Sequence, residues 1–155
     1  MNIPKYDLLA NTDSTLFKFE SNGTSGEISK GIAYTATKNE RLYNLGFGDL
    51  IFDPIINGYI IDDLVVSDNG DRNTVLATVV KSAYTFSEKY PDRNVFIRGS
   101  TKARTRLYRR AMSLNLQELL ETFHIFGAME DETGGVFDVP FDPNGDFYGF
   151  IIKRK

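Results

Sequence analysis

The sequence predicts an α+β fold of the order ββββαβαββ, in which a largely antiparallel sheet carries two main helices packed on one face. In the first half of the chain, apolar and polar residues alternate, which is the period of a half-buried strand. In the second half, apolar residues recur every three or four positions, which is the period of a helix. Short turn-like segments separate the extended stretches, so consecutive strands pair most simply as an antiparallel meander.

Four strands are expected in the first half, over residues 15–23, 27–37, 41–52 and 59–67. The third of them shows the period most clearly. Tyr43, Leu45 and Phe47 fall on one face, and the other face carries Leu42, Asn44, Gly46 and Gly48. The turn dipeptide Asn57-Gly58 then separates the third strand from the fourth.

A long helix is expected next, over residues 73–90. Asp71 or Asn73 is the expected N-cap, because a side-chain oxygen there can accept from an unpaired amide of the first turn. Pro91 ends the helix, since proline lacks the amide hydrogen that a helix interior needs. One apolar face is formed by Val75, Leu76, Val79, Val80, Ala83 and Phe86.

The basic helix of this chain is expected over residues 100–112, after a short buried strand at 94–99. Its buried side is expected to carry Ala103, Leu107 and Ala111, which follow one another at four-residue steps. A shorter helix is expected next, over 115–123, and it starts with a capping box of Asn115 and Glu118. A strand over 124–129 and a loop over 130–135 follow. A turn at 142–145 then leads into a final strand over 146–155.

The composition is that of one globular domain covering residues 1–155. The chain has no cysteine and one histidine, His124, which excludes disulfides, thiol nucleophiles and zinc sites built from cysteines or several histidines. Its start lacks the basic and apolar segments of an export signal, and its apolar runs are too short to cross a bilayer. A cytoplasmic protein is therefore expected.

Positive charge is concentrated between Arg98 and Arg110. This segment holds six cationic residues in thirteen positions and no acid, whereas the whole chain has a net charge of −3. Subtracting the +6 of the segment leaves −9 for the rest of the chain. This segregation argues for one local anion site and against nucleic-acid binding over the whole surface.

An anion site is predicted where the short strand meets the basic helix. A helix start offers unpaired amide N–H groups and a partial positive charge. Gly99 allows close backbone approach, and Ser100 or Thr101 can cap the helix or donate to an oxygen. The segment lacks the glycine spacing of a phosphate loop or of a dinucleotide site, so no nucleotide family is indicated by motif.

Three cations, Arg98, Lys102 and Arg104, flank that helix start, and guanidinium forks suit phosphate or carboxylate groups. Tyr108 lies among the arginines, where it can stack on a ligand ring or pack under an arginine stem. The predicted ligand-binding residues are therefore Arg98, Gly99, Ser100, Thr101, Lys102, Arg104 and Tyr108.

A simpler interpretation stays open beside the anion site. The same cations can solvate an exposed helix face, or pair with acids of the same chain. The candidate acids are Asp62, Asp63, Asp68 and Asp71. No metal site is predicted from these acids, because adjacent residues on a strand point to opposite faces and residues 68–71 lack calcium-loop spacing.

Three stretches carry a family resemblance: YNLGFGDL (43–50), IDDLVVSDNGDRNTVLATVVKSAYTFSEKYP (61–91) and GSTKARTRLYRR (99–110). In these stretches the chain resembles a family of small uncharacterised bacterial proteins, found mostly in Bacteroidetes, whose domain has no known function. The resemblance implies no catalytic residue.

The sequence favours a non-enzymatic binding or interaction module. Its expected partner is an anionic small molecule or an acidic protein surface, with nucleic acid as a second candidate, and no cofactor, metal or membrane is expected. One alternative is a small transferase or phosphoester hydrolase that uses the same anion site, with Asp62 or Asp63 as a base or metal ligand. Another is a regulatory or antitoxin-like partner, which predicts an exposed apolar patch or a dimer.

Overall fold

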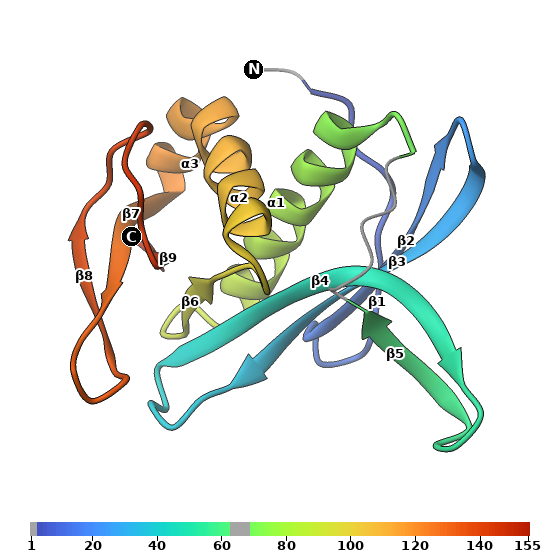
Figure 1. Ribbon diagram of the computed structural model, residues 1–155, viewed down its shortest axis with the longest axis horizontal. Helices are drawn as coiled ribbons and strands as arrows, with labels where there is room; N and C mark the ends of the chain where they lie inside the picture. The colour runs from blue at the N-terminus through green and yellow to red at the C-terminus, as the bar shows by residue number, and fades with distance from the viewer. Residues whose placement is uncertain (1–2, 63–68) are drawn as a thin grey trace.

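Nine strands and three helices form the described part of the chain, residues 3–62 and 69–155 of a computed structural model (Figure 1). The strands before the first helix are β1 (Leu9–Ala10), β2 (Leu16–Gly23), β3 (Gly26–Ala36), β4 (Leu42–Asp53) and β5 (Gly58–Asp62). The helices are α1 (Arg72–Lys89), α2 (Lys102–Leu114) and α3 (Leu116–Thr122). The later strands are β6 (Asn94–Ile97), β7 (Phe123–Glu130), β8 (Val136–Pro140) and β9 (Gly149–Arg154).

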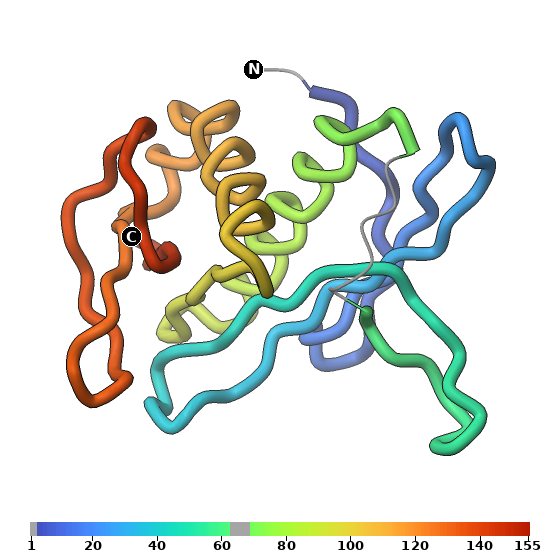
Figure 2. Tube along the Cα trace, in the orientation of Figure 1, coloured from blue at the N-terminus to red at the C-terminus, as the bar shows by residue number. Residues whose placement is uncertain are grey.

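The strands form one open sheet in the order β1-β2-β3-β4-β6-β9-β7-β8, with β5 beside β4. All neighbours are antiparallel except β4 and β6, which are parallel. One edge of β4 is shared, because residues 42–45 pair with β6 and residues 49–53 pair with β5. Neither strand reaches residues 46–48, so the sheet forks there, and the β4–β5 hairpin leaves the body of the molecule (Figure 2).

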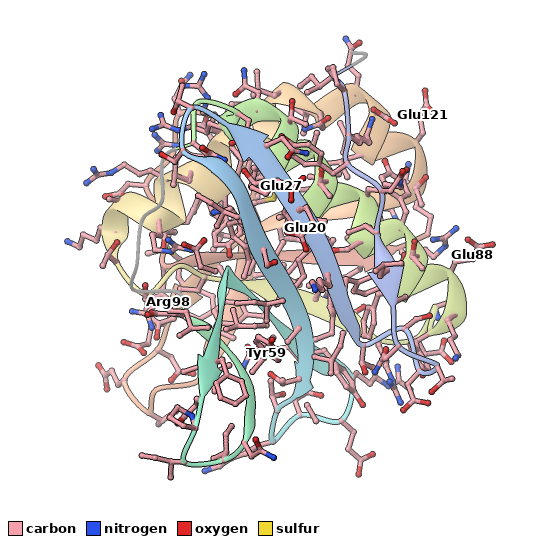
Figure 3. The ribbon with its side chains drawn as sticks, turned by 90° about the vertical axis from the view of Figure 1, so that its right-hand side faces the viewer. Glu20, Glu27, Tyr59, Glu88, Arg98 and Glu121 are labelled. Atoms are coloured by element: carbon pink, nitrogen blue, oxygen red, sulfur yellow. The ribbon has the colours of Figure 1, made fainter. Side chains whose placement is uncertain are left out.

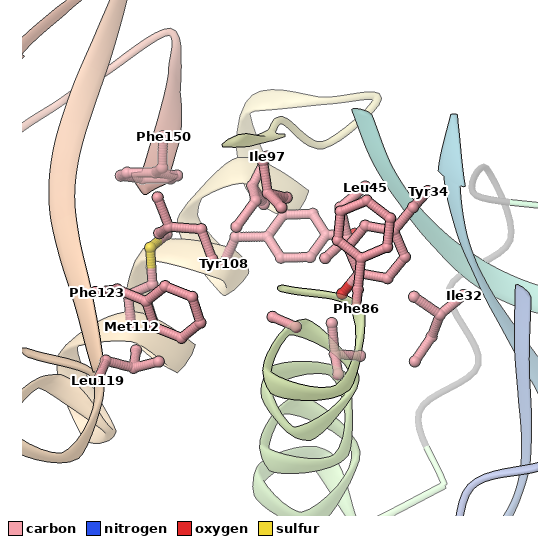
Figure 4. Close-up of a cluster of buried hydrophobic side chains, with 14 of the residues drawn as sticks. Ile32, Tyr34, Leu45, Phe86, Ile97, Tyr108, Met112, Leu119, Phe123 and Phe150 are labelled. Carbon is pink, nitrogen blue, oxygen red and sulfur yellow. The ribbon is translucent and has the colours of Figure 1, made fainter. Parts of the chain in front are cut away.

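The three helices lie on the same side of the curved sheet, between the β2–β3 strands and the β7–β8 strands (Figure 1). The core between helices and sheet is rich in aromatic rings (Figure 4). Tyr34 of β3 stacks on Phe86 of α1 with ring centroids 4.1 Å apart, and Phe123 and Phe150 are buried at the other end of the core. Each ring buries about 150–250 Å², so these contacts dominate the packing of helices on sheet.

Much of the expected fold is confirmed. The structure has the α+β class, a mostly antiparallel sheet and the meander of β2, β3, β4 and β5. The expected face of the first helix is buried or packed against the core over α1. No helix in the described residues is long and apolar enough to span a membrane.

The order of elements differs from the expectation in three places. The third helix, α3, was expected as the shorter helix over 115–123, but the expected order ββββαβαββ with two main helices does not include it. Two strands were not predicted: β1, which has two residues, and β8, an edge strand held by pairing with β7. The end of the expected fourth strand, residues 63–67, lies outside the described residues.

The buried face of α2 is only partly the expected one. Of the three expected residues, Ala111 is buried, Leu107 is only partly buried and Ala103 is exposed, whereas Tyr108 and Met112 belong to the core. Alanine offers little apolar area, and a tyrosine ring with a methionine offers far more, so the helix is rotated to bury the larger pair. This rotation decides where the cations of α2 point.

Two expected caps are placed differently. Asp71 is the N-cap residue of α1, but its carboxylate accepts from the hydroxyls of Tyr6 and Ser21 and makes no cap bond. Asn115 is the N-cap residue of α3 as expected, but its side chain makes no cap bond, and its Nδ2 donates to the Ala111 carbonyl at 2.7 Å. In both cases a tertiary or preceding-helix partner replaces the local one.

Candidate functional site

The connection between β6 and α2 is fixed by short-range hydrogen bonds. The hydroxyl of Thr101 accepts from the Arg104 amide at 3.2 Å, which makes Thr101 the N-cap of α2. The Gly99 amide donates to the Thr105 hydroxyl at 3.0 Å. A Cβ atom on Gly99 would lie 2.4 Å from the Cβ of Arg104, so glycine is required for α2 to pack on its own entry. The close approach expected at Gly99 is therefore made by the helix itself.

A cleft of about 410 Å³ opens beside this connection. One wall is formed by residues 98–102 and by the first turns of α2, including Arg106 and Arg109. The opposite wall is formed by residues 145–148, which precede β9. Arg109 joins the two walls, because its Nη1 donates to the Gly145 carbonyl at 2.6 Å. We call this site the cationic cleft.

The turn that carries the opposite wall is the one expected at 142–145. The Gly145 amide donates to the Asp142 carbonyl at 2.9 Å, which closes the turn. The Phe147 ring then packs on two glycines, so that a Cβ on Gly127 would lie 2.5 Å from the ring. Phe147 also lies in the aromatic cluster of Phe141 and Phe150. The wall is thus anchored to the core by aromatic contacts.

The charge of the cleft is strongly positive. Its lining contains four cations, Arg98, Lys102, Arg106 and Arg109, and one carboxylate, Asp146, which gives a net charge of +3. Among the residues that the structure describes, no carboxylate lies within 4.0 Å of the charged atoms of these four cations. The backbone amide of Lys102, which lines the cleft, and that of Ala103 beside it have no acceptor within the described residues. The cleft therefore offers donors and charge that the described chain does not use.

The aromatic component of the cleft is Tyr148. Arg98 lies at the molecular surface (Figure 3), and its guanidinium carbon is 3.9 Å from the centroid of the Tyr148 ring. Interaction with the Glu130 carboxylate raises the pKa of the Tyr148 hydroxyl, and the nearby Arg98 acts in the opposite direction. The stacked pair gives the cleft a planar, electron-rich surface next to a fixed cation.

The structure brings five of the expected site residues together in this cleft: Arg98, Gly99, Ser100, Thr101 and Lys102. It separates Arg104 and Tyr108 from them. Arg104 is buried and donates from Nη2 to the Phe47 carbonyl at 3.0 Å, in the gap where neither β5 nor β6 pairs with β4. It therefore satisfies an acceptor of its own chain.

Tyr108 is in the core and does not line the cleft. Figure 4 shows its ring pointing toward Ile97, Leu45 and the Tyr34–Phe86 pair. The aromatic role that the sequence assigned to Tyr108 is available instead at Tyr148. Nothing in the sequence marked Tyr148, because it was expected within the final strand.

Two cations that the expectation did not include, Arg106 and Arg109, also line the cleft. They lie four and seven residues after Lys102, so all three share one helix face. The spacing was visible in the sequence, but the face could be chosen only once the rotation of α2 was known.

The acids proposed as partners or catalytic groups lie elsewhere or outside the described residues. Asp62 is in β5 and does not line the cleft, and Asp71 is engaged by Tyr6 and Ser21. Asp63 and Asp68 lie outside the described residues. Within residues 3–62 and 69–155, no group of three or more histidines, aspartates or glutamates could hold a metal ion.

Comparison with known proteins agrees with the resemblance of the sequence. A model of a family of unknown function, DUF6934, matches residues 2–155. The chain belongs to this family. No curated protein and no solved structure matches it. The expectation of a domain without known function is confirmed, and the expected occurrence of its members in Bacteroidetes stays a prediction.

Proposed function

We propose that this protein is a non-enzymatic binding module that holds a small phosphorylated or carboxylated ligand in the cationic cleft. One observation carries the proposal. Four cationic side chains surround one cleft of about 410 Å³, and none of them has a carboxylate partner among the described residues. Clustered like charges repel one another, and an anion in the cleft relieves that repulsion.

The lining supports a ligand with two different ends. Arg98 and Lys102 stand beside the amides at the start of α2 that have no acceptor among the described residues, which suits a phosphate or carboxylate group. Phe147, Tyr148 and Met129 supply apolar and aromatic surface in the same cleft, which suits a planar or apolar remainder. The volume lies within the range of about 300–1,000 Å³ of small-molecule sites.

The alternatives have less support from the described residues. The enzymatic hypothesis required Asp62 or Asp63 beside the anion site, and Asp62 does not line the cleft. A nucleic-acid surface would use Arg110 as well as the cleft cations, because phosphate backbones contact cations along an extended surface. A single-stranded oligonucleotide is therefore included in the test.

The test is calorimetric titration of the protein with inorganic phosphate, a sugar phosphate, adenosine monophosphate, citrate and a short oligonucleotide. We expect binding of at least one small anion, with Arg98→Ala and Arg106→Ala each weakening it about tenfold or more, because a charge-assisted hydrogen bond contributes roughly 1.5–3 kcal/mol. A bound ligand at about 100 times its dissociation constant also raises stability by about 2.7 kcal/mol, which thermal unfolding measures.

Arg110→Ala is the matched control for Arg106→Ala. Both arginines are exposed on α2, but only Arg106 lines the cleft. The proposal predicts that Arg110→Ala leaves the affinity for small anions unchanged. Absence of binding by every small anion, or equal losses in the two variants, contradicts a site in the cleft. Binding of the oligonucleotide alone, with a steep dependence on salt, supports the nucleic-acid alternative instead.

A further inference from the structure

The β4–β5 hairpin exposes six large apolar side chains to solvent. Its tip residue Ile55 is 92% exposed and Tyr59 is 69% exposed. The other exposed apolar side chains of the hairpin are Ile51, Phe52, Ile56 and Ile60. Residues 54–61 carry no charge. Asp53 is the one charged residue between Ile51 and Ile61. Scattered exposed apolar residues are normal, but a group of six on one hairpin marks an interaction surface.

Both faces of the hairpin are apolar. Ile51 lies opposite Ile60 in the β4–β5 register, and Phe52 lies opposite Tyr59. Successive residues of a strand point to opposite faces, so these two pairs occupy different sides of the hairpin. The Phe52 and Tyr59 rings form an edge-to-face pair with centroids 5.5 Å apart. Figure 3 shows Tyr59 on the outward side of the hairpin, away from the helices.

The outer edge of β5 has no strand partner among residues 3–62 and 69–155. Among the described strands, only β4 pairs with β5. Monomeric proteins protect such an edge with lysine, proline or a bulge, and the sequence of β5, GYIID, contains neither lysine nor proline. The edge thus offers backbone donors and acceptors in a strand that is flanked by exposed apolar side chains.

We propose that the β5 strands of two copies of this chain pair antiparallel across a two-fold axis, and that the two hairpins form the dimer interface. The strand has five residues, so pairing over its whole length places Ile60 opposite the second copy's Ile60. Asp62 then lies opposite Gly58, and the two Asp62 residues are about 13 Å apart at about 3.3 Å per residue. An antiparallel edge is complementary to itself, which favours a second copy over an unrelated protein.

The exposed area is of the size that a stable dimer needs. From the exposed fractions and the sizes of the side chains, the six apolar residues of the hairpin leave on the order of 700 Å² exposed. Each partner in an interface of standard size buries roughly 800 Å². Pairing of the two edges adds backbone hydrogen bonds to this apolar contact.

The first test measures the molar mass of the full chain by light scattering over a range of concentrations. We expect a dimer at micromolar concentration, and we expect Ile60→Lys to weaken dimerisation about tenfold or more, because like charges directly opposite each other destabilise a strand pair. Phe137→Lys is the control, since Phe137 is a similarly exposed apolar residue of another edge strand, β8. A monomeric wild-type chain, or dissociation by Phe137→Lys and not by Ile60→Lys, overturns the proposal.

The second test uses the absence of cysteine in the chain. Ile60→Cys places two thiols directly opposite each other, where Cβ atoms are about 4.5–5.5 Å apart, close to the distance that a disulfide bridges. Mild oxidation of this variant is expected to give a covalent dimer, and oxidation of Phe137→Cys is expected to give none. Equal yields from both variants, or none from Ile60→Cys in a chain that circular dichroism shows to be folded, overturn the predicted register.

Discussion

Two groups of cations lie near α2, and they differ in burial and in their partners within the chain. In the buried group, Lys30 Nζ is 2.6 Å from Asp49 Oδ1, and Arg104 donates to the Phe47 carbonyl. Both cations also lie over the Phe47 ring. The lining of the cationic cleft contains four cations and one carboxylate, Asp146. Within the described residues, none of the four cations forms an ion pair.

The difference follows from solvation. A charge that leaves water loses several kilocalories per mole of hydration, so a buried cation must be paired within the chain. A cation that stays in water has no such requirement and is left for a ligand. In this protein the two outcomes occur within one helix, since Arg104 is buried and Lys102 is exposed two residues earlier. Burial of each side chain, and not the density of charge in the sequence, decides which cations are available for binding.

The largest expected effect tests the buried group. Lys30→Met removes one member of a buried ion pair and leaves the Asp49 carboxylate without that partner, so we expect a loss of about 3–5 kcal/mol in the free energy of unfolding. Urea unfolding at neutral pH measures it. Lys18→Met is the control, because Lys18 pairs with Glu20 at 3.6 Å on the exposed side of the neighbouring strand and its loss is expected to cost less than about 1 kcal/mol. Equal losses would show that the Lys30–Asp49 pair is not effectively buried.

An intermediate effect separates the two groups on α2 itself. Arg104→Met keeps the apolar stem and removes the donor to the Phe47 carbonyl, so we expect a loss of about 1–3 kcal/mol in stability from the unsatisfied acceptor. We expect the affinity for a small anion to stay within about twofold of the wild type, because Arg104 does not line the cleft. Urea unfolding and phosphate titration measure the two quantities. A larger loss of anion affinity in Arg104→Met than in Arg106→Ala would remove the distinction between the groups.

Much of the fold could be predicted from local pattern. Alternation of Phe17 and Phe19 with polar residues marked β2, and the three- and four-residue apolar steps from Val75 to Phe86 marked α1. These signals are strong because each element buries one face, so its apolar residues recur in the sequence with the period of a strand or a helix. The strands β1 and β8 have no such period, since pairing with β2 and β7 holds them in the sheet.

The site was only partly predictable, for a reason that α2 makes clear. The expected start at residue 100 lies two residues before Lys102, where α2 begins, and Thr101, one of the two expected caps, is its N-cap. The roles of Gly99 and Thr101 are local, which is why they could be expected. The orientation of the α2 side chains depends on which face packs on the core, and both candidate faces contain apolar residues. The face that packs on the core is the one that carries Tyr108 and Met112, because these large side chains fill space between α2 and strands distant in the sequence. Tyr148, from near the other end of the chain, could not be connected to Arg98 without the sheet order.

The smallest expected effect concerns an ion pair whose two side chains both remain exposed to solvent. Lys153 Nζ lies 2.9 Å from Asp138 Oδ2, and this hydrogen bond lowers the pKa of the Asp138 carboxyl. A carboxyl whose pKa is lower in the folded state stabilises the fold above its unfolded pKa of about 3.9, and this contribution is lost as the pH falls through the folded pKa. We expect Lys153→Met to return the pKa of Asp138 toward its ordinary value, with a loss of less than about 1 kcal/mol in stability at neutral pH.

Carbon-detected NMR titration of the side-chain carboxyls checks this expectation, and Asp131 provides an internal control. The pKa of Asp131 is lowered by hydrogen bonds from Thr133 and Gly135, not by a cation, so it should stay low in Lys153→Met. An unchanged pKa at Asp138 would show that the pair does not persist in solution. A loss of stability as large as that of Lys30→Met would mean that proximity of opposite charges, and not burial, governs both pairs, and the contrast between the two groups of cations would then need another cause.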